Sequence, residues 1–202
     1  MSEPYEAGDE IPGGSTLIEV RVAELRQLFD AMDPSPFRSR DLDPSAEEFI
    51  VGWARELPRD TRLALLVHLE RPAGQPDEAQ ALRNATHAFF QDRGRAARLR
   101  LTRLFQRGRV SLVIGLTFLG LALSASQLLE RWADAGGFVR LLQESLLIGG
   151  WVAMWRPIEI FLYDWWPIRA EVRLFERLAA MPVRIRYGAG DADAWRRDWP
   201  AI

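Results

Sequence analysis

The sequence predicts an α+β membrane protein, in which a two-helix transmembrane hairpin carries a small cytoplasmic α/β domain built from both chain ends. Three observations predict it. Residues 110–129 contain no ionisable side chain, and a helix of that length is about 30 Å long, which matches the hydrocarbon thickness of a bilayer. A second apolar segment occupies residues 141–168. Alternation typical of strands occurs before the first segment and after the second.

Composition limits the alternatives. The 202 residues suffice for one modest domain and a membrane segment, and the absence of cysteine excludes disulfides and thiolate metal sites. All 26 basic residues are arginine, which we interpret as the codon habit of a GC-rich bacterium. The net charge of −2 hides an asymmetry, because seven arginines and no acid lie between Arg93 and Arg109.

The chain begins with an acidic segment, residues 1–15, that has no hydrophobic periodicity and is expected to be a disordered leader. The cytoplasmic α/β domain is expected over residues 16–93. Its first strand is predicted at Thr16–Val22, where apolar residues alternate, and a helix is predicted at Ala23–Met32.

A second helix is expected to follow Asp43, which has the position of an N-cap before Pro44. We expect this helix to bury three side chains: Phe49, Ile50 and Trp53. The apolar run Arg62–Glu70 is interpreted as the second strand.

A long helical pattern begins at Asp77, and its apolar stripe comprises Leu82, Ala85, Phe89 and Phe90. The remaining boundaries follow from composition: a basic stem helix at 94–109, the first transmembrane helix at 110–129, an external hairpin loop at 130–140, the second transmembrane helix at 141–168 with a kink at Pro157, a returning helix and strand at 169–187, and a flexible tail at 188–202. The domain therefore has about three strands and two to three helices. The last strand, Val183–Tyr187, is expected to join the first two in one mixed sheet.

Arginine counts predict the orientation. Seven arginines precede the first span, whereas the predicted loop has only Arg131 and Arg140. The positive-inside rule therefore predicts that both termini are cytoplasmic, in the inner membrane of a bacterium.

The second span contains unusual charges. Its uncharged core, residues 145–155, is too short to cross a bilayer unaided. The candidate intramembrane charge cluster comprises Glu144, Arg156, Glu159 and Asp164. One interpretation is an ion path or a partner site. The other, which we favour, is that Arg156 extends to the headgroups while aromatic side chains anchor the interface: Trp155, Tyr163, Trp165 and Trp166.

Small residues four apart predict close helix packing, within one chain or between chains. The candidates are Gly115, Gly120, Ser124, Gly149 and Ala153. The basic stem predicts contact with lipid headgroups through Arg98, Arg100, Arg103, Arg107 and Arg109. We prefer lipid over nucleic acid as the partner of this stem because only Phe105 could supply base stacking within it.

No catalytic, cofactor-binding or metal-binding motif is recognisable, and His68 and His87 have no partner at ligand spacing. We therefore expect no enzyme and no cofactor. The leading hypothesis is a membrane anchor or accessory subunit that forms a homo-oligomer or binds a larger membrane protein. A homo-oligomeric pore lined by the charges of the second span is the alternative, and ligand sensing by the soluble domain is a third hypothesis.

Overall fold

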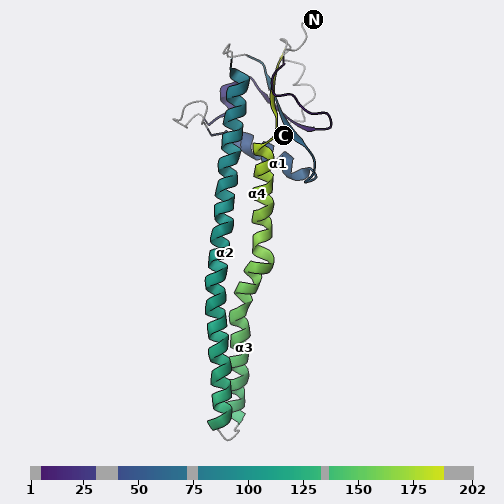
Figure 1. The fold of residues 1–202 in the computed structure, drawn as a ribbon. Helices are drawn as coiled ribbons and strands as arrows, with labels where there is room; N and C mark the ends of the chain where they lie inside the picture. The colour runs from purple at the N-terminus through teal and green to yellow at the C-terminus, as the bar shows by residue number, and fades with distance from the viewer. Residues whose placement is uncertain (1–5, 31–40, 72–76, 133–136, 189–202) are drawn as a thin grey trace. The chain divides into compact units, whose positions relative to one another are not determined.

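The computed structural model describes residues 6–30, 41–71, 77–132 and 137–188. Its contacts divide the chain into two units (Figure 1). The first combines residues 1–94 with 173–202 and contains the sheet, whereas the second, residues 95–172, is helical where it is described. The fold is mixed α and β, with a small four-stranded sheet and two long apolar helices. The α+β class predicted from the sequence is confirmed.

The sheet has the strand order β1-β4-β3-β2. Strands β2 (Thr16–Val22), β3 (Leu63–Leu69) and β4 (Val183–Tyr187) are parallel neighbours. The prediction that these three segments share one sheet is confirmed, but the antiparallel pair that makes the sheet mixed involves β1, which was not predicted. The central strand β3 reads LALLVHL and is buried at every position except His68. A nearly continuous apolar run is typical of a parallel strand with neighbours on both sides.

The predicted leader needs a correction, because β1 (Glu6–Gly8) pairs antiparallel with β4. Two arginines of β4 hold Glu6: Arg184 at 2.9 Å and Arg186 at 2.7 Å. These ion pairs lower the pKa of the exposed Glu6 carboxyl, chiefly through the hydrogen bond from Arg186. The partners lie at the opposite end of the sequence, so local composition could not reveal this strand. Residues 1–5 lie outside the described part of the chain.

Two helix predictions also change. The helix expected at Ala23–Met32 is a single 3-10 turn, η1 (Leu25–Leu28), in the described part of that segment. Helix α1 (Pro44–Glu56) begins as predicted, because Asp43 accepts a hydrogen bond from the Ser45 amide at 2.9 Å.

Helix α1 buries Ile50, as expected, together with Val51 and Ala54. The expected burial of Phe49 and Trp53 is wrong, because these side chains are 37 % and 47 % exposed. They lie one turn apart and stack on each other beside the buried face, with ring centroids 6.2 Å apart.

Helix α2 (Glu78–Trp132), helix α3 (Gly137–Glu159), the π-helical turn η3 (Ile160–Asp164) and helix α4 (Trp165–Ala179) all lie between β3 and β4 in the sequence. They therefore belong to the crossover that connects two parallel neighbours. Such a connection must bring the chain back to the end of the sheet at which β3 begins, because β4 starts at that same end. The first turns of α2 accomplish this return.

Helix α2 runs antiparallel to β4 within the first unit. The hydroxyl of Tyr187, at the end of β4, lies 3.2 Å from the Glu78 carboxylate, and His87 lies 2.8 Å from the carbonyl oxygen of Met181, just before β4 begins. The predicted stripe of α2 is confirmed as core: Leu82, Ala85, Phe89 and Phe90 are buried. Phe90 also stacks on Phe175 of α4. The segments by which the chain leaves the sheet unit and re-enters it are therefore in contact with each other.

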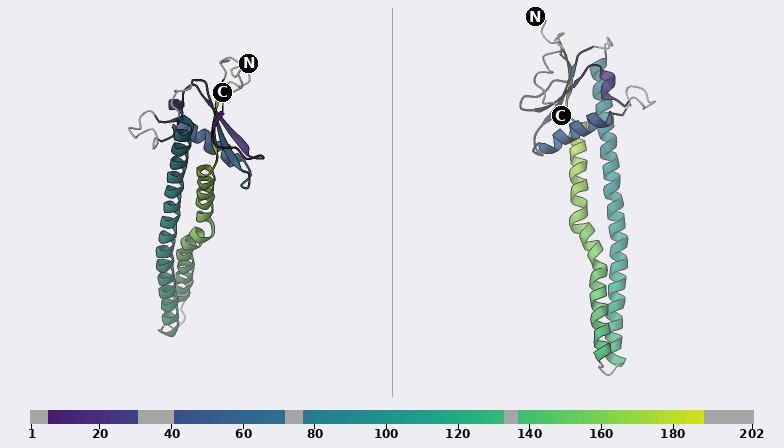
Figure 2. Two further views of the ribbon diagram at one scale, coloured as in Figure 1. Left: turned by 45° about the horizontal axis from the view of Figure 1, so that its top comes forward. Right: turned by 180° about the vertical axis from the view of Figure 1, so that it is seen from behind.

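Helix α1 lies beside the part of α2 and the part of α4 that belong to the sheet unit, as two further views show (Figure 2). Arg93 of α2 pairs with Glu47 of α1. Arg177 of α4 donates hydrogen bonds to the carbonyl oxygens of Pro58 and Thr61, which follow α1. The two ends of the long crossover are therefore fastened to one another through α1 and the loop after it.

Alternate residues of the strands form a polar face of the sheet. On it, His68 lies 3.0 Å from Glu19. Partial burial lowers the pKa of the His68 imidazole, and the neighbouring Arg21 and Arg186 lower it further, while Glu19 opposes the shift. The neutral ring is therefore the form that the folded protein favours.

We predict that Gly8→Ala destabilises the sheet unit by about 1–3 kcal/mol. Gly8 has a φ of 119°, and a Cβ there would lie 2.6 Å from the Val183 carbonyl oxygen. The thermal unfolding of the detergent-solubilised protein measures the effect. Gly13→Ala is the control, since a Cβ at Gly13 meets nothing within 4 Å. Equal melting temperatures for the two variants would contradict the positive φ of Gly8 and its close approach to Val183.

We predict that His68 makes stability fall as the solution is acidified. Its folded pKa lies below the unfolded value of 6.5, so the unfolded chain binds the proton more readily and stability is lost as pH drops below the unfolded pKa. Melting temperatures at about pH 7.5 and about pH 5.5 measure this slope. His68→Asn should reduce it, and an unchanged slope in that variant would assign the pH dependence to other groups.

Candidate functional site

Two helical stretches among the described residues are long and apolar enough to cross a membrane by length and composition: Glu78–Leu128 and Gly137–Ala179. The core helix of a soluble protein can satisfy the same criteria, but such a helix is mostly buried. Here only 11 % and 17 % of the most apolar windows are buried. Large apolar side chains such as Ile114 and Val152 are exposed, which is typical of a surface that lipid or another protein covers.

Glycines on α2 let it approach α3 closely. A Cβ at Gly115 would lie 3.0 Å from the carbonyl oxygen of Ala153, and one at Gly108 would lie 2.9 Å from the side chain of Ile160. Gly108, Gly115 and Ala122 are all buried and recur at intervals of seven residues. This interval keeps one seam of a helix facing its partner in a left-handed pair.

Pro157 contributes to the same seam. Proline has no amide hydrogen, so the carbonyl of Ala153, four residues earlier, loses its usual helical partner. This carbonyl oxygen is the atom against which Gly115 packs. Helix α3 nevertheless continues through Pro157 to Glu159, and the irregularity follows as the π-helical turn η3. The kink at Pro157 stays a prediction, and the π-helical turn is an irregularity that was not predicted from the sequence.

The predicted packing residues divide into two groups. Gly115 and Ala153 meet in the seam, and Gly149 lies near it, since a Cβ there would be 3.8 Å from the ring of Phe118. Gly120 and Ser124 are exposed instead, and a Cβ at Gly120 meets nothing within 4 Å. The Ser124 hydroxyl donates a hydrogen bond to the Gly120 carbonyl oxygen in its own helix. This second pair therefore takes no part in packing α2 on α3.

Three of the four predicted charges come together. Arg156 lies 2.7 Å from Glu159 and 3.8 Å from Asp164. Glu144 precedes Arg156 by 12 residues of the same helix, a rise of about 18 Å, so it does not belong to this cluster. We use the name Arg156 cluster for Arg156, Glu159 and Asp164.

Contacts along the seam give the level of each charge in the hairpin. Gly108, at the basic end of the apolar run, packs on Ile160, which lies between Glu159 and Asp164 in the sequence. The opposite end is marked by Gln143, whose side-chain amide donates to the Ser126 carbonyl oxygen at 3.1 Å. The Arg156 cluster and Glu144 therefore lie toward opposite ends of the paired helices.

The side chain of Arg156 extends toward the basic end of the hairpin, because both carboxylates that it meets follow it in the sequence. This is the direction in which an arginine near the end of a span reaches polar headgroups. The geometry therefore favours the interpretation of Arg156 as an interfacial residue.

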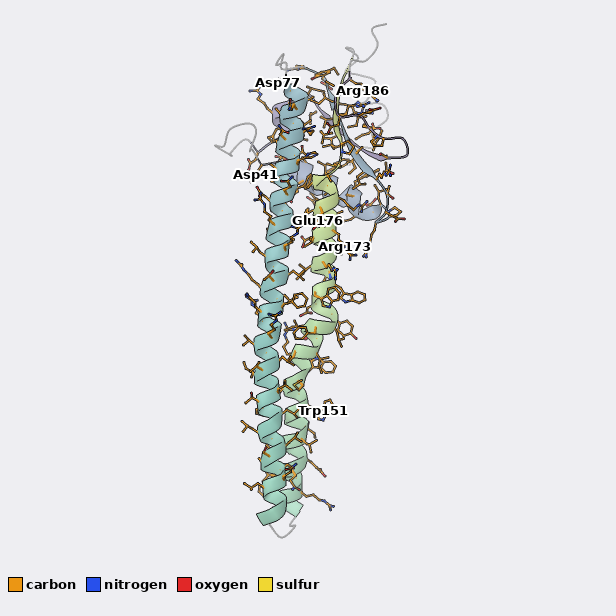
Figure 3. All side chains as sticks on the ribbon, in the orientation of Figure 1. Asp41, Asp77, Trp151, Arg173, Glu176 and Arg186 are labelled. Atoms are coloured by element: carbon orange, nitrogen blue, oxygen red, sulfur yellow. The ribbon has the colours of Figure 1, made fainter. Side chains whose placement is uncertain are left out.

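The predicted aromatic anchors behave differently from one another. Trp155, Tyr163 and Trp166 are 65–70 % exposed. Trp165 is half-buried, and its indole Nε1 donates to the carbonyl oxygen of Phe161, 2.9 Å away in the π-helical turn. Trp151 also projects from α3 on the side away from α2 (Figure 3). The aromatic side chains are therefore spread along the helix from Trp151 to Trp166 and do not all lie at one level.

Among the arginines of the predicted stem, Arg100 has a protein partner, Glu171 of α4, at 3.1 Å. Arg98, Arg103, Arg107 and Arg109 are also exposed. The described residues contain no group of three or more histidine or acidic side chains that could hold a metal ion. His68 and His87 have the protein partners already described.

No known protein family matches this chain, and neither does any characterised protein or solved structure with which it was compared.

Sequence reasoning missed Gly108, Gly150 and the role of Pro157. Gly150 is buried, and a Cβ there would lie 2.6 Å from the side chain of Leu119. Gln143, Gly150 and Pro157 recur at intervals of seven, as Gly108 and Gly115 do on α2. The seven-residue spacing continues from the predicted basic stem into the first apolar segment and through the second, and it marks these residues, whereas the four-residue spacing also selected Gly120 and Ser124.

We predict that Gly115→Leu destabilises the hairpin by about 1–3 kcal/mol, the usual cost of overpacking. Its side chain would meet the backbone of α3, which cannot move without separating the two helices. Gly149→Leu is the matched control, because its Cβ meets only a ring edge at an ordinary distance. Melting in detergent compares the two, and a Gly149→Leu protein that loses as much stability as Gly115→Leu would contradict the proposed seam.

Proposed function

We propose that this chain is a non-catalytic protein of the bacterial inner membrane that acts as an anchor or accessory subunit of a membrane complex. In this proposal the second unit spans the membrane as a helical hairpin, and the sheet unit lies at the cytoplasmic surface with both termini. The exposed apolar surfaces of α2 and α3 support insertion, because water would solvate them poorly.

The exposed face around Gly120 carries the proposal of a partner. Gly108, Gly115 and Gly150 account for the close packing within the chain. Gly120 and Ser124 lie outside that seam, on an exposed stripe of α2 that also includes Thr117. Small residues at such spacing allow a second helix to approach. We infer that this stripe packs against a membrane helix of another copy or of a larger protein.

The pairing of the Arg156 cluster argues against the pore hypothesis. Arg156 is engaged by two carboxylates of its own chain, and Glu144 lies toward the other end of the hairpin. Residues 145–155, between Glu144 and Arg156, therefore contain no ionisable group that could line a path.

We predict that the protein remains in the membrane pellet during alkaline carbonate extraction. Its native mass after mild detergent extraction should exceed the 23.0 kDa of one chain. Gly120→Leu should reduce the assembly to the lone chain, because the added side chain prevents close approach of the second helix.

Leu121→Phe is the control for this experiment, since it adds bulk at a neighbouring residue that is 65 % exposed and points in another direction. A wild-type protein found only as a lone chain would overturn the accessory-subunit proposal. Equal assembly by wild type and Gly120→Leu would remove the stripe from the interface. Release of the wild-type chain by carbonate would overturn insertion itself.

A further inference from the structure

A groove of about 740 Å³ runs along the seam between α2 and α3, within the helical unit. Its volume lies in the range of pockets that hold small molecules. Small residues give the groove its depth, because Gly115 is buried and Gly149 and Ala153 are partly buried. The large side chains of Ile114 and Val152 stand at its rim, where both are more than 60 % exposed.

The lining of the groove is strongly asymmetric along its length. From Val110 to Phe118, its α2 side is apolar apart from the hydroxyl of Ser111. At the other end it is bounded by Gln106 and Arg107. No ion pair of Arg107 occurs within the described residues, and its side chain is exposed. The groove therefore combines an apolar trough with a cation at one end.

The length of the groove matches one leaflet of a bilayer. Arg107 and Phe118 are 11 residues apart on one helix, a rise of about 16 Å. Half of the bilayer hydrocarbon is about 15 Å thick. An acyl chain that begins beside Arg107 would therefore reach the Phe118 end near the middle of the membrane.

We propose that this groove binds one acyl chain of an anionic phospholipid, whose phosphate meets Arg107. This inference rests on the membrane insertion proposed above. The apolar trough supplies contact with the chain, and the guanidinium supplies charge-assisted hydrogen bonds to phosphate oxygens. Small residues on the floor are required because side chains there would fill the space of the acyl chain. The site lies in the leaflet next to the arginine-rich end of α2, which the proposed function identifies as the cytoplasmic leaflet.

The test uses the full chain reconstituted into vesicles of equal parts phosphatidylcholine and phosphatidylglycerol. After mild detergent extraction, native mass spectrometry counts and identifies the phospholipids that remain bound. We predict one retained phospholipid per wild-type chain, enriched in phosphatidylglycerol by roughly fivefold, as expected for one arginine near an anionic headgroup. Arg107→Gln should abolish the enrichment.

Arg109→Gln is the matched control, because it removes the same charge two residues away from a side chain that does not line the groove. Contacts of Arg109 with headgroups at the bilayer surface end on detergent extraction, so this variant should leave the enrichment of the retained phospholipid unchanged. Gly149→Leu should reduce the amount of bound lipid of either kind, because the leucine side chain extends into the groove. Gly149→Ala adds a single methyl group and should retain most of it.

Two results would overturn this inference alone: an inserted wild-type chain without enrichment in phosphatidylglycerol, or an equal loss of enrichment in Arg107→Gln and Arg109→Gln. The second result would indicate general attraction to the anionic surface. Resistance to carbonate extraction is measured on the same vesicles. A wild-type chain that fails to insert would overturn both this inference and the proposed function.

Discussion

The pairing of β3 with β4 is the constraint on which the rest of the chain depends. Two parallel neighbours require a crossover, and here that crossover contains both long apolar helices. Helix α2 runs back along β4 before it leaves the sheet unit, as the contacts of Glu78 and His87 record. A hairpin inserted between neighbouring strands has both of its ends connected to the same sheet.

The helical pair follows a second constraint, which is the absence of side-chain volume at the seam. Gly108, Gly115 and Gly150 permit close approach, and Pro157 frees the Ala153 carbonyl oxygen that faces Gly115. In a lipid environment no hydrophobic force draws two apolar helices together, so packing and polar contacts must suffice. The stretch of the second apolar segment between Glu144 and Arg156 carries no charge, and it contains Gly150 and Ala153 of this seam. Packing and charge placement are therefore consistent with each other.

Sequence patterns predicted those elements that local periodicity specifies. The bounds of β2 and β4 agree with the predicted strands, and the apolar stripe of α2 is buried where it was expected. Strand β1 escaped detection because Glu6 is held by arginines almost the whole chain away. The spacing of small residues correctly included Gly115, but one helix alone does not reveal which face its partner takes. The contacts between α2 and α3 identify the face of α2 that carries Gly115 as the packed one. Contacts along the two helices also place Glu144 away from the Arg156 cluster.

The position of β4 has a consequence for biosynthesis. A ribosome makes β2 and β3 early, but β4 emerges only after both long helices have been synthesised. Strand β1, although made first, has no edge to join until then, because its partner is β4. The sheet can therefore be completed only after the entire hairpin has been synthesised. A chain stalled before this point presents an open β3 edge, a form that cellular quality control could distinguish from the finished protein.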